Sequence, residues 1–324
     1  MRIAILGTGR MGVTRARLLA ADPSVAEVVL AGGDAARTAA VAAGCGATAA
    51  TVEEALGASP DAVVVASATD RHAEQLQACL ALGVPVLCEK PIALTVADTA
   101  ASVAALREAG VPVQVGFQRR FDAGFHAIRD AVTAGRVGTV YALRLTSRDA
   151  TPAEEHYIPG SGGIFRDMHV HDFDLARWIT GREVVSAYAA GAVRGFERFA
   201  RHGDVDTTAI VLRLDDGTLV TIDGARHDPR GYDVRMEVLG SQDALSAGLD
   251  DRTPLAGAAG PAWQTFPERF AAAFAAETAA FLAFARDGGD SPCPPEAALE
   301  ALRVAVACDR SRAEGRAVTL AEPA

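Results

Sequence analysis

The chain has 324 residues, 50% of them hydrophobic and 22% charged, and its formal net charge is −10. This composition is typical of a globular protein, and the length is sufficient for two domains with separate cores. The acidic balance argues against a nucleic-acid partner, because phosphate binding needs clustered Lys and Arg, and no apolar stretch approaches the roughly 20 residues of a membrane-spanning helix.

The first predicted elements are a strand, a glycine-rich turn and a helix. The apolar run RIAILG (2–7) leads through GTGRMG into a helix-like stretch, and a second strand-like run, EVVLA (27–31), follows. Gly7, Gly9 and Gly12 form a G-x-G-x-x-G motif at the junction. Glycines there allow a tight turn and let a pyrophosphate approach the backbone at a helix N-terminus, so the motif predicts dinucleotide binding.

The alternation of apolar runs and helical segments continues to residue 117. Strands are expected at 61–67, 85–90 and 112–117, and helices at 72–83 and 95–109. Such βαβ units predict a buried parallel sheet. We interpret this region as a dinucleotide-binding domain, the alternative being a doubly wound domain that binds a different ligand.

The end of the second strand bears on the choice between NAD and NADP. Gly32 stands where a carboxylate would bind the adenosine ribose of NAD, and Asp34 and Arg37 follow. The missing carboxylate removes repulsion toward a 2′-phosphate, and Arg37 can bind one. NADP is therefore favoured, although Asp34 can still serve NAD and Arg37 can be a solvated helix charge.

Lys90 is the only lysine in the chain. It stands in Glu89-Lys90-Pro91, at the C-terminal end of a predicted parallel strand, on the edge where open α/β sheets bind ligands. Lysine differs from arginine in offering a compact ammonium with a tunable pKa, and Pro91 favours an extended Lys90. A chemical role is predicted, with chance retention in a loop as the alternative.

A second group of polar residues lies in SGGIFRDMHVHDFDLARWIT (161–180). On an α-helix Asp167, His171 and Asp174 share one face, whereas His169 points nearly opposite. A carboxylate one turn from an imidazole can orient the ring and raise its basicity for proton transfer. Two alternatives are a metal site at His169 and His171 and a structural helix start with dipole-favoured acids.

The cysteines and the first residues bear on the compartment. Five cysteines without a C-x-x-C pair indicate buried or incidental thiols in a reducing environment. MRIAILGTGR enters a strand-like run with no apolar signal segment. We expect a cytoplasmic protein with no membrane partner.

The motifs EKP, VGFQRRFD (115–122) and SGGIFRDMHVHDFDLARW (161–178) together resemble the Gfo/Idh/MocA oxidoreductases, most closely the inositol 2-dehydrogenase branch. The resemblance implies an α/β Rossmann domain at 1–118, with a doubly wound parallel sheet. It also implies an α+β substrate domain at 119–324, with a large open-faced, mostly antiparallel sheet that assembles the chain into a homodimer or homotetramer. Strand-like stretches with turn signals between them follow Phe121, as this domain requires.

The resemblance also implies roles for single residues, and no metal. The catalytic residues are Lys90, Asp167 and His171. The cofactor, NAD or NADP, is expected to contact Gly7, Gly9, Arg10, Met11, Gly12, Gly32, Asp34, Arg37, Ser67, Thr69, His72, Glu89 and Lys90. A polyol substrate is expected to contact Lys90, Arg119, Arg120, His156, Tyr157, Asp167, His171, Asp174 and Tyr232. Gln118, Ser147 and Gly32 depart from the residues common in the family, which leaves the identity of the polyol open.

The reaction that we expect is reversible oxidation of a ring secondary alcohol of an inositol or a similar sugar. His171 takes the hydroxyl proton, Asp167 holds the imidazole ring, and Lys90 stabilises the developing alkoxide. Two rival functions are an NAD-dependent glycosidase of the same fold, which performs no net oxidation, and a non-catalytic regulator that senses cofactor levels. A non-catalytic regulator does not need to retain Lys90, Asp167 and His171, so the presence of all three argues against that function.

Overall fold

The computed structural model describes residues 1–248 and 263–321. Its residues group into two compact units, one of Met1–Phe117 with Ala275–Leu299 and the other of Gln118–Phe274 with Glu300–Ala324. The expected border between residues 118 and 119 stays a proposal, and residues 275–299 belong by their packing to the first unit. Within the described ranges, no helix is long and apolar enough to cross a membrane.

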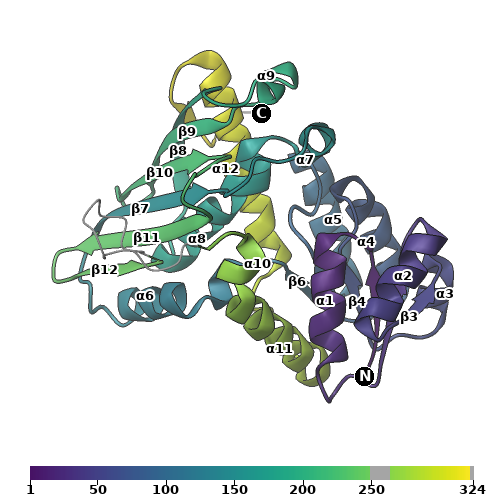
Figure 1. Ribbon diagram of the computed structural model, residues 1–324. Helices are drawn as coiled ribbons and strands as arrows, with labels where there is room; N and C mark the ends of the chain where they lie inside the picture. Colours follow the sequence, from purple (N-terminus) through teal and green to yellow (C-terminus); the bar gives the residue numbers. More distant parts are fainter. Residues whose placement is uncertain (249–262, 322–324) are drawn as a thin grey trace, which may run out of the picture. The chain divides into compact units, whose positions relative to one another are not determined.

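The first unit contains a six-stranded parallel sheet in the order β3-β2-β1-β4-β5-β6 (Figure 1). Its strands are β1 (Arg2–Leu6), β2 (Glu27–Ala31), β3 (Thr48–Ala50), β4 (Ala62–Val65), β5 (Val86–Cys88) and β6 (Val113–Val115). Strand order reverses between β1 and β4, and open sheets of this kind bind dinucleotides beyond the C-terminal strand ends at that position. The expected doubly wound sheet is confirmed.

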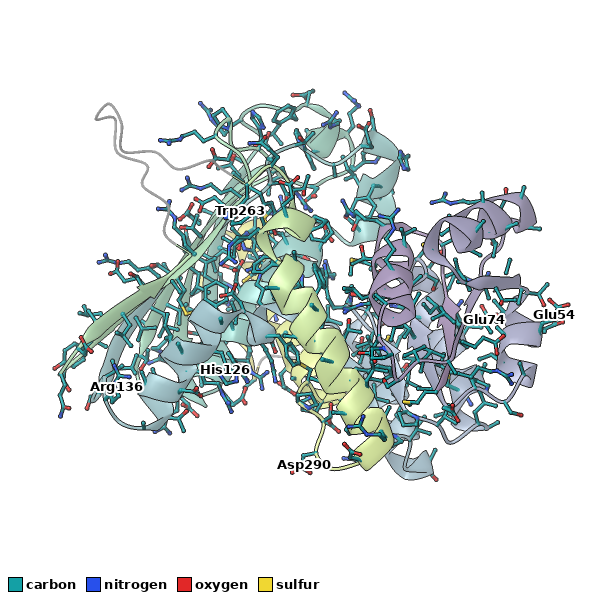
Figure 2. The ribbon with its side chains drawn as sticks, turned by 60° about the horizontal axis from the view of Figure 1, so that its bottom comes forward. Glu54, Glu74, His126, Arg136, Trp263 and Asp290 are labelled. Atoms are coloured by element: carbon teal, nitrogen blue, oxygen red, sulfur yellow. The ribbon has the colours of Figure 1, made fainter. Side chains whose placement is uncertain are left out.

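Side-chain caps fix where several helices of this unit begin. The helices are α1 (Arg10–Ala20), α2 (Ala35–Cys45), α3 (Val52–Gly57), α4 (His72–Leu80) and α5 (Val96–Ala109), with a 3-10 turn at Thr69–Arg71. Asp34, Thr51 and Thr95 accept backbone N–H bonds at the starts of α2, α3 and α5, which stabilises a helix N-terminus. Glu54, labelled in Figure 2, completes a capping box on α3.

Residues 275–299 complete the first unit because their aromatic side chains enter its core. Phe281, Leu282 and Phe284 of α11 (Ala271–Asp287) are buried in one cluster with Ile3 and Ile5 of β1. The carbonyl of Cys293 accepts a bond from the Val115 N–H at the end of β6. A segment distant in sequence is therefore part of the dinucleotide-binding unit.

The second unit is built on a seven-stranded sheet in the order β12-β11-β7-β10-β9-β8-β13 (Figure 1). Its strands are β7 (Val140–Arg148), β8 (Val184–Ala192), β9 (Thr207–Leu214), β10 (Leu219–Ala225), β11 (Asp233–Gly240), β12 (Ala244–Ala247) and β13 (Val318–Thr319). β7 and β10 pair in parallel, and the other pairs are antiparallel. The expected mostly antiparallel sheet is confirmed.

The helices of this unit leave one face of the sheet partly uncovered. They are α6 (Ala123–Thr133), α7 (Ile158–Ser161), α8 (Val170–Thr180), α9 (Arg198–Arg201), α10 (Phe266–Arg269) and part of α12 (Pro295–Glu314). Trp178 of α8 packs on His126 of α6, with ring centroids 5.8 Å apart; Figure 2 labels His126, and Arg136 beyond the end of α6. Along β9 buried and exposed side chains alternate, which is typical of a sheet with one open face.

Candidate functional site

The turn between β1 and α1 is shaped by close backbone approach. Gly7 has a φ of +130°, and a Cβ there would lie 2.3 Å from the Ala66 carbonyl oxygen. A Cβ on Gly12 would lie 2.0 Å from the Gly7 carbonyl oxygen. Both positions therefore require glycine for packing.

The same turn fits the pyrophosphate of a dinucleotide. Gly9 caps α1 without a side-chain bond, the first turn of α1 has no acidic residue, and a Cβ on Gly9 would meet nothing within 4 Å. The space beside Gly9 at this helix start is therefore open, and the helix dipole favours an anion there. Arg10 and Met11 form the first turn beside it.

Any side chain at the position that follows β2 would crowd two threonines. A Cβ on Gly32 would lie 2.7 Å from both Thr38 Oγ1 and Thr8 Cγ2. Asp34 lies beyond it and accepts the Arg37 N–H at 2.8 Å, while the Arg37 guanidinium donates to the Thr8 carbonyl at 3.1 Å. Arg37 is thus held beside the glycine turn, with Asp34 used as a helix cap.

His72 connects the segments that follow β4 and β5. Its Nδ1 lies 2.9 Å from the Pro91 carbonyl oxygen and its Nε2 lies 3.2 Å from that of Ser67. Burial lowers the pKa of His72. The ring is 1% exposed, so the structure places it as a link between these segments, with Thr69 in the 3-10 turn before it.

Glu89 belongs to a buried ionic group. Both Nε and Nη2 of Arg15 donate to its Oε1, at 2.9 and 2.7 Å, and Arg15 also pairs with Glu277 of α11 at 2.6 Å. Gly116 leaves the space that Glu89 occupies, because a Cβ there would lie 2.6 Å from Glu89 Oε2. The strand end that carries Lys90 is therefore anchored, and the Lys90–Pro91 peptide bond is cis.

Asp167 lies in a π-helical turn, Phe165–His169, before α8 begins at Val170. At Asp167 the helix is therefore not the regular α-helix that the sequence predicted, and the shared face of Asp167, His171 and Asp174 stays a prediction. Asp167 Oδ1 accepts the Tyr157 hydroxyl at 2.9 Å, and its Oδ2 accepts Arg226 Nη1 at 2.8 Å. His171 is buried in the first turn of α8.

His169 belongs to a fully buried hydrogen-bond network. Its Nδ1 lies 2.8 Å from Asp172 Oδ2 and its Nε2 lies 2.7 Å from Thr208 Oγ1. Asp172 also accepts bonds from Arg119 and Ser147. Both nitrogens of His169 therefore face protein partners, which favours a structural role over ligation of a metal. Thr208, His169 and Asp172 form a hydroxyl–imidazole–carboxylate chain, but all three residues are buried and out of reach of a substrate.

The expected substrate residues fall into buried and exposed sets. Arg120 donates to both oxygens of Asp174, at 2.8 and 2.5 Å, and Arg119 is 2% exposed. Burial raises the pKa of Tyr232 to about 12, so its hydroxyl keeps its proton at neutral pH. His156 and Tyr157 are exposed on a 3-10 turn.

The structure adds residues that the sequence did not single out. Arg15, Glu277, Asp172, Thr208 and Arg226 support the predicted ones through charge pairs and hydrogen bonds. The sequence offered a clue to two of these residues. Asp172 lies within the motif SGGIFRDMHVHDFDLARW (161–178), and Arg226 directly follows a strand-like run. The partner of Arg15 on α11 lies 262 positions away, and no local pattern predicts it.

Comparisons with known proteins cover nearly the whole chain. Residues 1–117 match the family model "Oxidoreductase family, NAD-binding Rossmann fold" and residues 125–246 match the "GFO/IDH/MocA C-terminal domain". The chain is 39% identical to the myo-inositol dehydrogenase Hyg17 of Streptomyces leeuwenhoekii over 97% of this chain and 98% of that protein.

Solved structures of inositol dehydrogenases also superpose on nearly the whole chain. A putative myo-inositol dehydrogenase of Sinorhizobium meliloti superposes with a TM-score of 0.93 at 34% identity, covering 99% of this chain and 100% of that one. A scyllo-inositol dehydrogenase of Lactobacillus casei, with bound NAD(H) and scyllo-inositol, superposes with a TM-score of 0.91 at 26% identity, covering 99% of each chain.

The matched family model, together with the parallel sheet and the glycine turn, identifies the chain as an oxidoreductase with an NAD-binding Rossmann unit. Both matched models describe one family, and together they span more than half of the chain. The chain belongs to the GFO/IDH/MocA family.

Proposed function

We propose that this protein oxidises a ring secondary alcohol of an inositol or a related cyclitol to the ketone, with NAD or NADP as cofactor. One structural observation carries the proposal. The glycine turn follows β1, the only lysine follows β5, and the parallel order β1-β4-β5 places both at the same sheet edge. Relatives that match almost the full chain are named inositol dehydrogenases.

The proposed mechanism assigns one task to each catalytic residue. His171 accepts the proton of the reacting hydroxyl, and Asp167 orients its imidazole ring. Lys90 donates a hydrogen bond to the reacting oxygen and stabilises its developing negative charge. When bound, the nicotinamide supplies the hydride acceptor.

The other polar residues are proposed to bind the polyol or to support its binding. The Arg120–Asp174 pair combines donors with acceptors, as an array of hydroxyls requires. Tyr232, His156 and Tyr157 add a phenol, an imidazole and a second phenol. Arg119 is proposed to act by fixing Asp172 and Ser147.

The test is a substrate panel. Purified protein is mixed separately with NAD and NADP and with myo-inositol, scyllo-inositol, other cyclitols and simple sugars, while reduced nicotinamide is followed by absorbance. A rise with a cyclitol supports the proposal. Cofactor binding without any rise would contradict it and favour the glycosidase or the regulator, and glycoside cleavage would then be measured.

We further propose that NADP is accepted through Arg37. The site after β2 lacks a carboxylate that would repel a 2′-phosphate, and Arg37 lies beside the glycine turn. Arg37→Ala is expected to raise the KM for NADP roughly tenfold and to change the KM for NAD little, because one charge-assisted hydrogen bond is lost. Arg71→Ala, at an exposed pair with Glu74, is the matched control. Equal effects on both cofactors would refute the proposal.

We also propose that the open face of the second sheet joins copies of this chain in a homodimer or homotetramer. The register aligns Glu237, Arg144, Thr221, Val211 and Tyr188 in one row across five strands. They line a groove of about 440 Å³. Exposed apolar side chains beside paired charges are typical of a self-complementary interface.

A charge placed on this face is expected to prevent assembly. Val211→Glu should elute and sediment as a monomer because it buries an unpaired carboxylate at the interface. Ala104→Glu, at an exposed position of α5, should keep the mass of the wild type. A wild-type monomer, or an assembled Val211→Glu variant, would refute this interface.

All five cysteines are free, and we propose that the protein works in the reducing cytoplasm.

A further inference from the structure

Arg226 directly follows β10, at the end of the second unit's sheet where its one parallel strand pair among the described residues, β7 and β10, terminates. β10 and β7 run in parallel, so Arg226 and Asp149 emerge side by side, one residue beyond each strand. Two backbone bonds fix them: Asp149 N–H donates to the Ala225 carbonyl at 2.9 Å, and Arg226 N–H to that of Asp206 at 2.8 Å. The sheet therefore places a cation and a carboxylate at a rigid edge.

The Arg226 side chain reaches from this edge to the π-helical turn. Its Nη1 lies 2.8 Å from Asp167 Oδ2 and 3.5 Å from Asp149 Oδ2, and the residue is 3% exposed. Although burial opposes the charge, Asp167 and Asp149 raise the pKa of Arg226, so the guanidinium stays charged. Tyr157 donates to the other oxygen, Oδ1, of Asp167.

Two carboxylates thus depend on one buried guanidinium. If the cation is removed, Asp167 and Asp149 lose the guanidinium that both contact, and the mutual repulsion of two nearby carboxylates is no longer offset by it. The Asp167 carboxylate is then held by fewer contacts and can turn on the Oδ2 side. Such a turn alters the orientation that the proposed mechanism requires of Asp167 toward the His171 ring.

We propose that Arg226 is a positioning residue for the reaction, which holds the Asp167 carboxylate in a fixed orientation. The inference rests on the proposed function, because it assigns Arg226 a role through a proposed catalytic carboxylate. Displacing such a group by about 1 Å can cost on the order of 10²-fold in rate. Substrate binding depends far less on it, so the effect is expected in kcat.

The same sheet edge offers a matched control. Arg148 ends β7 and pairs with Asp223 at 2.6 Å and with Asp228 at 3.6 Å. Like Arg226, Arg148 is an arginine surrounded by acidic residues, although it is only partly buried. Its ion pairs are formed with carboxylates other than Asp167. A change there perturbs the sheet edge without removing the counter-charge of Asp167.

The experiment compares Arg226→Met, Arg226→Lys and Arg148→Met, with rates expressed per folded enzyme from NADH-binding stoichiometry and thermal unfolding. Arg226→Met is expected to lower kcat by about 10²-fold, with KM changed less than about threefold. Arg226→Lys should recover kcat to within roughly tenfold of the wild type, because one nitrogen, Nη1, makes the ion pairs with both Asp167 and Asp149 and an ammonium can replace it. Arg148→Met should keep kcat per folded enzyme.

Several results would overturn the inference. Equal loss in Arg226→Met and Arg148→Met, failure of lysine to recover kcat, or a change confined to KM would each indicate a structural role. An active wild type with an unchanged Arg226→Met variant refutes only this inference. A wild type that oxidises no cyclitol refutes the proposed function, and the inference with it.

Discussion

Replacing Lys90 by methionine is expected to lower kcat by about 10³-fold, because the developing alkoxide loses its positive hydrogen-bond donor in a partly dry site. Methionine keeps the length and the apolar stem of lysine, so the strand end should pack as before. The measurement is steady-state oxidation of the best cyclitol from the panel. NADH binding, followed by fluorescence, is expected to persist because the glycine turn is unchanged.

The informative companion is Lys90→Arg, which keeps the charge and removes the compact ammonium. A planar guanidinium is broader and practically never loses its proton. We therefore expect a kcat far closer to Lys90→Met than to the wild type. Near-full turnover by a properly folded Lys90→Arg variant would contradict the role given to the only lysine.

Replacing Arg15 by methionine is expected to destabilise the first unit by about 3–5 kcal/mol, the usual cost of breaking a buried ion pair. Glu89 and Glu277 would remain buried without their shared cation. Urea unfolding above pH 7 measures the loss best, because the pKa of Glu277 is raised to about 7 by burial and by Glu89.

One control variant completes this test. Arg2→Met breaks the exposed pair with Glu27 and should cost less than about 1 kcal/mol. If Arg15→Met costs no more than Arg2→Met, the buried group does not stabilise the first unit.

Glu277→Gln addresses the pH dependence of the same group. With its pKa raised from 4.5 to about 7 on folding, Glu277 contributes stability below pH 4.5 that is lost as the pH rises through 7. The stability of the wild type relative to Glu277→Gln should therefore fall between these pH values, by on the order of 3 kcal/mol. A difference that is independent of pH would show that Glu277 does not take up a proton on folding.

The first unit could be predicted from the sequence because its signals are local. Residues 3–6 of β1 are apolar and buried, and the glycine spacing reflects close backbone approach at Gly7 and Gly12. The short strand at Thr48–Ala50 was not predicted, since three small residues form no distinctive pattern. The packing of residues 275–299 with this unit depends on Phe281 and Phe284 meeting residues far earlier in the chain.

For the candidate site, the sequence indicates residue types, whereas the local geometry differs from the regular helix that the sequence predicted. Helical periodicity assumes a constant angle per residue, and the π turn at Phe165–His169 breaks that assumption. His169 was set aside because it points away from Asp167 on a regular helix, yet it bonds Asp172 at the centre of a buried network. Contacts such as Arg226 to Asp167 join residues 59 positions apart, and sequence periodicity carries no information about them.

The most direct test of the central claim is the stoichiometry of oxidation. Protein, cofactor and the preferred cyclitol are incubated to partial conversion, reduced nicotinamide is measured by absorbance, and the ketone is measured by mass spectrometry. The account predicts one equivalent of ring ketone for each equivalent of reduced cofactor. Cleavage of a glycoside without accumulated reduced cofactor, or no ketone while cofactor is bound, would contradict it.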